Sequence, residues 1–193
     1  MSTEKKAPAK DWVRLVASIL EMRNNEHQYR SDLAALRRGL SPETELYALP
    51  YVASFVADSR IKPMTRVAGL MATFPQIAQL SGERKWKSFG AYCYEVSRAL
   101  TQDAKDSFTP NPRKPDVIAS RLRAMPALDL EGLTGHVRSI LANAQRTHVE
   151  IDFYNLAALF LYWGKGFSTA SREHRQKPLR DYYSADHQFN YTK

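Results

Sequence analysis

The segment DFYNLAALFLYWG, residues 152–164, constrains the fold of this chain more than any other segment. Drawn as a helix it is apolar on nearly every side, which is typical of a helix buried at the centre of a domain. Gly164 is expected to end this helix. Because such a helix needs other helices around it, the rest of the chain should supply an amphipathic shell.

Apolar residues at helical spacing predict that shell. Asp11 and Ser31 are expected to cap the first two helices, and Ser88, Asp116 and Asp152 later ones. The further helices are expected over 49–56, over 65–80 with Pro75 kinking or shortening the helix, over 89–100, over 116–125, over 130–144, and in a last segment that reaches about Tyr183 and is broken at Pro178.

No segment combines strict alternation of apolar residues with an excess of β-branched side chains, the pattern of a strand. We therefore predict an all-α fold, a single compact helical-bundle domain of about seven to nine helices spanning 11–193. The chain has 193 residues, of which 44% are hydrophobic, enough for a sizeable core. Residues 1–10, MSTEKKAPAK, are polar and charged and are expected to form a flexible basic tail.

The only cysteine, Cys93, lies in an apolar and aromatic segment and cannot form an internal disulfide. A single unpaired cysteine is typical of a protein in a reducing compartment. We interpret Cys93 as a buried residue and not as a nucleophile. No apolar run approaches the roughly 18 residues of a membrane span, and the lysine-rich start lacks the apolar core of a signal peptide. We expect a cytoplasmic protein that does not contact membranes.

Motifs for catalysis are sparse. The five histidines include no zinc-hydrolase spacing, and there is no cysteine pair, glycine-rich phosphate loop or nucleophile elbow. The nearest cluster, His148 with Glu150 and Asp152, is interpreted as a loop followed by a helix cap. We predict no enzyme activity, no catalytic residues, no metal and no cofactor; a nuclease built on Glu150 and Asp152 is the least favoured alternative.

The charge of the chain points to a different kind of function. With 28 Lys and Arg against 20 Asp and Glu, the formal net charge is +8. Such an excess favours polyanionic partners, because neutralising phosphates releases condensed counterions. A solvated basic surface explains the excess equally well, so the placement of the arginines matters more than their number.

The segment LAALRRGL, residues 33–40, shows that placement. On a helix whose core stripe is Leu33, Leu36 and Leu40, Arg37 lies about 65° from the centre of the stripe and Arg38 about 165° from it. Arg37 should therefore flank the core and Arg38 should point to solvent, with Gly39 ending the helix. Interaction with the helix C-terminal dipole is an alternative to phosphate binding for both arginines.

Later helices repeat this construction. In the helix after Asp116, Arg123 lies opposite the core stripe and Arg121 at its edge, and in the next helix Arg138 is lateral and Arg146 is opposite the stripe. Several helices thus present arginines outward without a matching acidic partner four residues away, whereas a solvated face usually carries both signs. The repetition favours a surface that binds nucleic-acid backbone.

Several segments, in this order, resemble one known family: ALRRGL, SFGAYCYEVSRAL, VIASRLRAM, LTGHVRSILANAQ, IDFYNLAALFLYWGKG and LRDYY. The chain resembles the small subunit, CasB, of the type I-E CRISPR surveillance complex Cascade, from Asp11 to about Tyr183. This resemblance implies a non-catalytic, all-helical subunit, present in two copies, whose basic surface holds the target and displaced strands of the R-loop. By position it implies nucleic-acid contacts for Arg37, Arg38, Arg123, Arg138 and Lys165.

The leading hypothesis is therefore a Cascade subunit that binds nucleic-acid backbone through Arg37, Arg38, Arg121, Arg123, Arg138 and Lys165 and stabilises the R-loop during antiviral defence. The expected partners are other Cascade subunits, a second copy of the chain, the CRISPR guide RNA and the single-stranded R-loop strands of the target DNA. The alternative is a structural scaffold whose basic face contacts guide RNA or acidic protein surfaces.

Overall fold

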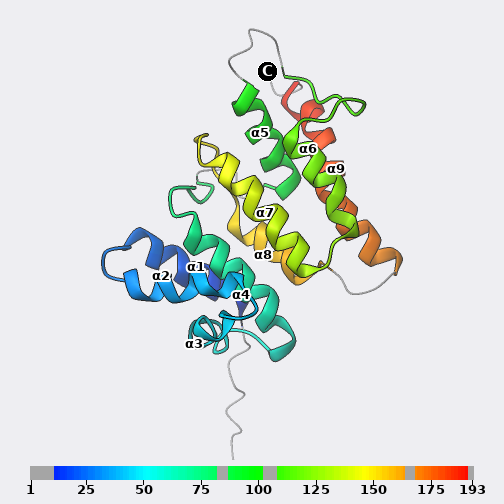
Figure 1. Ribbon diagram of the computed structural model, residues 1–193. Coiled ribbons are helices and arrows are strands. Elements are labelled where there is room, and N and C mark those ends of the chain that lie inside the picture. Colours follow the sequence, from blue (N-terminus) through cyan, green and yellow to red (C-terminus); the bar gives the residue numbers. More distant parts are fainter. Residues whose placement is uncertain (1–10, 82–86, 102–107, 164–167, 191–193) are drawn as a thin grey trace, which may run out of the picture.

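A computed structural model describes residues 11–81, 87–101, 108–163 and 168–190 of the chain (Figure 1). The expected tail over 1–10, the expected helix stop at Gly164 and the candidate Lys165 lie outside the described residues. The division into a flexible tail and a helical domain therefore stays a prediction.

The described residues form nine α-helices and three short 3-10 helices and no strand, which confirms the all-α class. One isolated bridge joins Gln79 to Ile151. The elements in chain order are α1 (Trp12–Asn24), α2 (Arg30–Arg37), η1 (Arg38–Leu40), η2 (Glu45–Tyr47), α3 (Leu49–Val52), α4 (Asp58–Thr73), α5 (Phe89–Thr101), α6 (Val117–Ala124), η3 (Met125–Ala127), α7 (Leu130–Ala144), α8 (Phe153–Leu161) and α9 (Thr169–Asn190).

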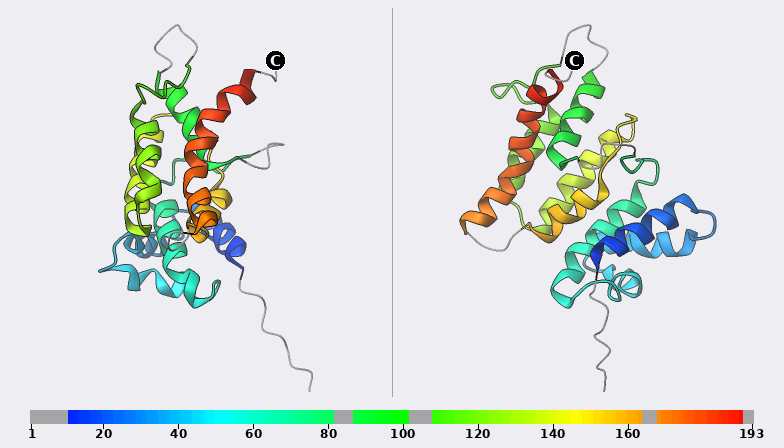
Figure 2. Two further views of the ribbon diagram at one scale, coloured as in Figure 1. Left: turned by 90° about the vertical axis from the view of Figure 1, so that its right-hand side faces the viewer. Right: turned by 180° about the vertical axis from the view of Figure 1, so that it is seen from behind.

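The helices form two groups that meet at α7 and α8 (Figure 1). Helices α1 to α4 gather at one end of the molecule, and α5, α6 and α9 at the other. Seen from behind, α1, α8 and α9 lie on the side away from α7 (Figure 2). Helix α8 contacts α1, α4 and α5, and five of its side chains are buried: Phe153, Leu156, Ala157, Leu159 and Phe160. The predicted central helix is confirmed.

Side-chain caps begin several helices where the sequence predicts them. Asp11 accepts a hydrogen bond from the Val13 amide, Asp116 from Ile118 and Ala119, and Asp152 from Tyr154 and Asn155. These oxygens satisfy amides that have no partner within the helix. The prediction for Ser31 is wrong, since α2 already begins at Arg30 and has no side-chain cap.

Of the two predictions about proline, one is confirmed and one is wrong. The helix expected over 65–80 is α4, which begins earlier, at Asp58, and contains Pro63, but it is shortened as expected and ends at Thr73, just before Pro75. Pro178 does not break the last helix, because α9 continues through it. At Pro178, α9 packs closely against α5. A Cβ on Gly90 of α5 would lie too close to the carbonyl oxygen of Pro178, so only glycine permits this approach of the two helices.

A buried arginine ties the first group of helices together. Nη2 of Arg23 in α1 donates hydrogen bonds to the carbonyl oxygens of Phe74, Pro75 and Ile77, which follow the end of α4. The guanidinium also lies 4.5 Å from the ring centroid of Phe153 at the start of α8. Burial lowers the pKa of Arg23 to about 10. Arg23 is thus a structural cation that is not available to an external anion.

Candidate nucleic-acid interface

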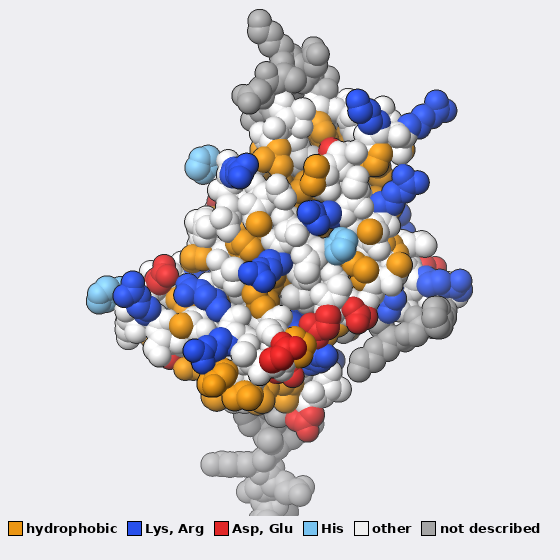
Figure 3. Space-filling view, viewed as in Figure 1, with side chains coloured by type: hydrophobic (Ala, Val, Ile, Leu, Met, Phe, Trp, Pro, Cys, Tyr) orange, Lys and Arg blue, Asp and Glu red, His pale blue; other side chains and the backbone are white. Residues whose placement is uncertain are grey.

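The described candidate arginines lie on a connected set of elements. Arg37 ends α2 and Arg38 begins η1, while Arg121 and Arg123 occupy the last turn of α6 and Arg138 lies in α7. Helix α7 contacts both α6 and α4, and α4 contacts α2 and η1. The space-filling view shows Lys and Arg side chains spread over the regions of α2, α7 and α6, with uncharged surface between them (Figure 3).

Three of these arginines meet the first requirement of a phosphate-binding residue. Arg38, Arg123 and Arg138 are exposed. Within the described part of the chain, none of them forms an ion pair. Their guanidinium groups are therefore free to neutralise an external anion, and the expectation that Arg38 and Arg123 point to solvent is confirmed.

Arg37 is partly occupied inside the protein. Its Nε donates a 2.8 Å hydrogen bond to the carbonyl oxygen of Ala72 in α4, and its Nη2 lies 3.4 Å from a carboxylate oxygen of Glu26. The expectation that Arg37 flanks the core is confirmed. Its polar contact is with the last turn of α4, however, and not with the end of its own helix.

Arg121 is half-buried, as its predicted position at the edge of the core stripe requires. Its Nε is buried and has no hydrogen-bond partner among the described residues. Arg121 is therefore less accessible to a strand than Arg123 two positions later.

Arg38 is held by an aromatic ring that the sequence analysis did not single out. Its guanidinium carbon lies 4.3 Å from the ring centroid of Tyr47 in η2, and Tyr47 itself is 47% exposed. The carbonyl oxygen of Arg38 also accepts a hydrogen bond from the hydroxyl of Thr44. A cation on an aromatic face keeps its N–H edge free for phosphate. Only a tertiary contact reveals this pair, because the two residues belong to different elements.

The prediction that Gly39 ends the helix is wrong. The chain continues from α2 into η1, and Gly39 is buried within it with no left-handed φ. A Cβ at Gly39 would lie 2.8 Å from Cγ2 of Thr65 and 3.0 Å from Cβ of Ala48. Glycine is needed here so that η1 can approach α4 closely.

Beneath η1 lies a fully buried arginine, Arg66 of α4. Its Nη1 donates to the carbonyl oxygen of Gly39 at 2.6 Å, and its Nη2 lies 2.7 Å from a carboxylate oxygen of Glu45. It also binds Glu131 at the start of α7. Burial lowers the pKa of Arg66, but hydrogen bonds to the two carboxylates outweigh it and raise the pKa. A lone arginine within the apolar segment 64–72 is the signal that sequence analysis missed.

Carboxylates interrupt the basic face. Figure 3 shows acidic side chains clustered beside the region of η1 and the start of α7. Among them, Glu131 is paired with Lys62 and Arg66, and Glu45 with Arg66. The exposed arginines therefore form separate contact points and not one uninterrupted stripe.

The residues considered for catalysis are either buried or engaged in structural hydrogen bonds. Cys93 is wholly buried, and burial raises the pKa of its thiol well above the ordinary value. Asp152 caps α8, as predicted, and Glu150 accepts hydrogen bonds from Ser81. In the ranges that the structure describes, no group of three His, Cys, Asp or Glu side chains is placed to hold a metal ion.

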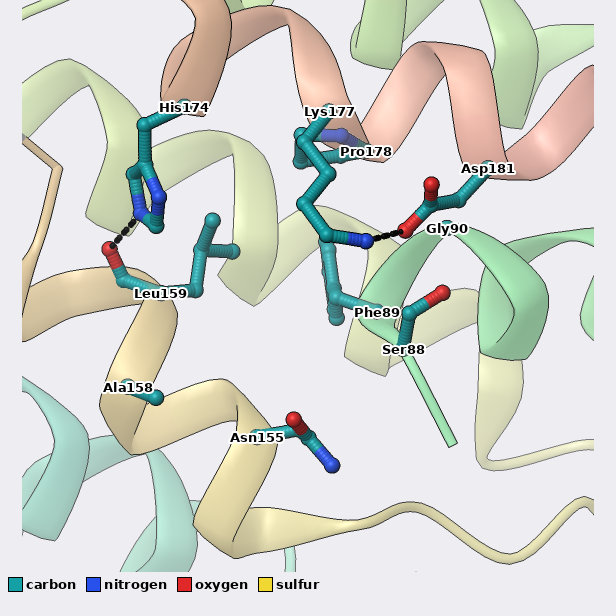
Figure 4. Close-up of a pocket in the computed structure, with 10 residues that line it drawn as sticks. All are labelled: Ser88, Phe89, Gly90, Asn155, Ala158, Leu159, His174, Lys177, Pro178 and Asp181. Carbon is teal, nitrogen blue, oxygen red and sulfur yellow. Dashed lines mark hydrogen bonds and ion pairs between the residues drawn. The ribbon is translucent and has the colours of Figure 1, made fainter. Parts of the chain in front are cut away.

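A small hollow lies where α5, α8 and α9 meet (Figure 4), with a volume of about 190 Å³. Its polar side chains have partners within the protein: Lys177 pairs with Asp181, and Nε2 of His174 lies 3.3 Å from the carbonyl oxygen of Leu159. Its cation and its carboxylate are thus paired within the protein.

None of the described helices is long and apolar enough to cross a membrane.

The described residues thus form an all-helical fold that carries exposed arginines on adjoining helices. The model of the family described as CRISPR-associated protein Cse2 matches residues 32–183, and this chain belongs to that family. The resemblance to the small subunit of type I-E Cascade is confirmed. No curated protein sequence matches the chain.

Two solved structures have a similar fold. One is a chain of a structure titled "CRISPR RNA-guided surveillance complex", with a TM-score of 0.65 and 22% identity over 93% of this chain and 95% of that chain. The other is from a structure titled "CRISPR RNA-guided surveillance complex, pre-nicking", with a TM-score of 0.62 and 22% identity over 92% of this chain and 97% of that chain. At this identity the likeness establishes the fold.

Proposed function

We propose that this chain is a non-catalytic subunit of a type I-E CRISPR surveillance complex, in which its exposed arginines bind nucleic-acid backbone and stabilise the R-loop. Membership of the Cse2 family and the titles of the two similar structures support the assembly. The partners in this proposal are the other Cascade subunits, a second copy of the chain, the guide RNA and the single-stranded R-loop strands of the target DNA.

The observation that carries the proposal is the exposure of Arg38, Arg123 and Arg138 on connected elements, without acidic partners among the described residues. R-loop formation is close to energetically balanced, so a few backbone contacts are enough to shift it. Each phosphate that a guanidinium neutralises also releases a counterion. Sequence is read by the guide, and the subunit needs only charge and shape.

The other candidates rank below these three. Arg37 and Arg121 are half-buried, so we assign them a supporting role at the edge of the face. Lys165, which follows the Trp-Gly pair of the family resemblance, stays a prediction because it lies outside the described residues.

The test is a triple variant in the assembled complex, with Arg38, Arg123 and Arg138 each changed to Glu. The matched control changes Arg14, Arg172 and Arg180 to Glu; these residues are exposed, and they belong to α1 and α9, two helices that lie on the side away from α7 (Figure 2). The formal charge changes by the same amount in both variants. R-loop formation is measured as affinity for target DNA over a series of salt concentrations.

We expect the triple variant to weaken R-loop formation and to lower the salt slope by about 0.7 to 0.9 for each phosphate that is no longer neutralised. The control should change both quantities much less. Equal effects of the two variants would show that only net charge matters. A complex that forms R-loops normally with the triple variant would overturn the proposal and favour the scaffold alternative.

A further inference from the structure

A second hollow lies between the C-terminal end of α5 and the chain that follows α7, and none of the candidate arginines lines it. It has a volume of about 350 Å³ and is lined by Glu95, Arg98, Ala99, Arg146, Thr147, His148 and Val149. In Figure 3 a Lys or Arg side chain and a His side chain lie near each other over this end of α7. A hollow of this size is in the range of small-ligand sites in proteins.

The carboxylate that lines the hollow, Glu95, is neutralised by a lysine of the same chain. Nζ of Lys87 lies 2.7 Å from a carboxylate oxygen of Glu95, and the two side chains are 9% and 13% exposed. Lys87 is held in place by a further hydrogen bond to the carbonyl oxygen of Glu150. Among the other lining residues, Arg146 carries a positive charge, and the imidazole of His148 adds a donor. The hollow is therefore electropositive.

Capping of α7 does not account for Arg146. Thr147 performs that task, because both its amide and its hydroxyl donate to the carbonyl oxygen of Ala144 at 2.8 Å. Arg146 is exposed, and within the described residues its side chain forms neither a hydrogen bond nor an ion pair. An exposed arginine at the rim of a hollow that also contains a histidine is placed to bind an oxyanion.

We infer that this hollow is a binding site for a phosphodiester group of a single nucleic-acid strand, with Arg146 and His148 as its donors. The inference rests on the proposed function, since the strand is the source of the phosphate. It adds to the candidate face a contact point at the far end of α7. It names two residues, Arg146 and His148, outside the set that the sequence analysis assigned.

The experiment uses the full-length isolated chain. His148 ring resonances are followed by NMR while dimethyl phosphate, inorganic phosphate or a ten-nucleotide oligothymidylate is added, and oligothymidylate affinity is measured against salt concentration. The test variant is Arg146→Gln and the matched control is Arg14→Gln, which removes an exposed arginine from α1.

We expect dimethyl phosphate and the oligonucleotide to shift the His148 resonances in the native chain and not in Arg146→Gln. The variant should weaken oligonucleotide binding about fivefold at 0.1 M salt and lower the salt slope by about 0.7, the change expected when one phosphate is no longer neutralised. Arg14→Gln should leave both unchanged.

Two outcomes would overturn the inference. Resonances that respond to inorganic phosphate alone would assign the hollow to a free phosphate, and unchanged resonances together with an unchanged slope would remove the site altogether. The variant with Arg38, Arg123 and Arg138 changed to Glu separates this result from the proposed function. If its His148 resonances still respond to dimethyl phosphate, the hollow binds phosphate whatever the candidate face does.

Discussion

Arg66 and Glu131 form a two-point contact in which Nε and Nη2 of the arginine each donate a 2.9 Å hydrogen bond to one carboxylate oxygen. The arginine is fully buried in α4, and the glutamate lies in the first turn of α7. The same guanidinium binds the carbonyl oxygen of Gly39, the residue after Arg38. One buried cation thus fixes the element that carries Arg38 relative to the helix that carries Arg138.

Replacing Arg66 with Met should destabilise the fold strongly. The substitution removes the buried guanidinium that binds Glu131, Glu45 and the Gly39 carbonyl group, and breaking a buried ion pair from one side costs about 3–5 kcal/mol. The free energy of unfolding in urea is the measurement. The control is Lys62→Met, because Lys62 is an exposed partner of Glu131 and should contribute no more than about 1 kcal/mol. Equal losses in the two variants would contradict the assigned role.

The same cluster predicts a loss of stability in acid. The hydrogen bond from Arg66 lowers the pKa of Glu131 below its ordinary value of 4.5. Because the folded pKa is depressed, the stabilisation is fully present above the unfolded pKa and is lost as the pH falls through the folded pKa. Unfolding free energies measured from pH 7 to pH 3 should fall below about pH 4.5. Glu131→Gln should flatten this part of the profile, and an unchanged profile would refute the assignment.

Two glycines should respond to alanine in opposite ways. Gly90→Ala places a Cβ against the Pro178 carbonyl oxygen and should separate α5 from α9, at a cost of about 1–3 kcal/mol or more. Gly135 in α7 is exposed and has no atom within 4 Å of the added Cβ, so Gly135→Ala should stabilise the helix by about 0.5–1 kcal/mol. Thermal unfolding of both variants checks the signs. Destabilisation by both would show that space at the Cβ does not decide the outcome.

The stacking of Arg38 on Tyr47 should contribute to the proposed nucleic-acid binding. Tyr47→Leu removes the aromatic face and should weaken binding of the assembled complex by about twofold to fivefold, the effect of an exposed cation–π contact of about 0.5–1 kcal/mol. Tyr47→Phe keeps the ring and should bind normally. In an Arg38→Gln background, Tyr47→Leu should have no further effect. An undiminished effect there would mean that Tyr47 acts without Arg38.

Local patterns in the sequence were sufficient for most of the fold. The starts of the helices at Asp11, Asp116 and Asp152 were predicted because a cap depends on residues within three positions. Pro178 was misjudged for a related reason. It lies inside a helix that packing sustains, as Pro63 does in α4, and no local rule contains that packing energy.

In the candidate site, too, some features follow from neighbours in the sequence and others depend on tertiary packing. Helical geometry by itself determined that Arg38 and Arg123 point away from the core and that Arg37 and Arg121 lie at its edge, because these directions depend only on neighbours in one helix. Tertiary structure decided that Arg66 is a buried anchor, that Tyr47 holds Arg38, and that Arg146 faces a hollow with His148. The sequence determines that an arginine is charged, but tertiary structure decides its partners, because they belong to elements that are distant along the chain.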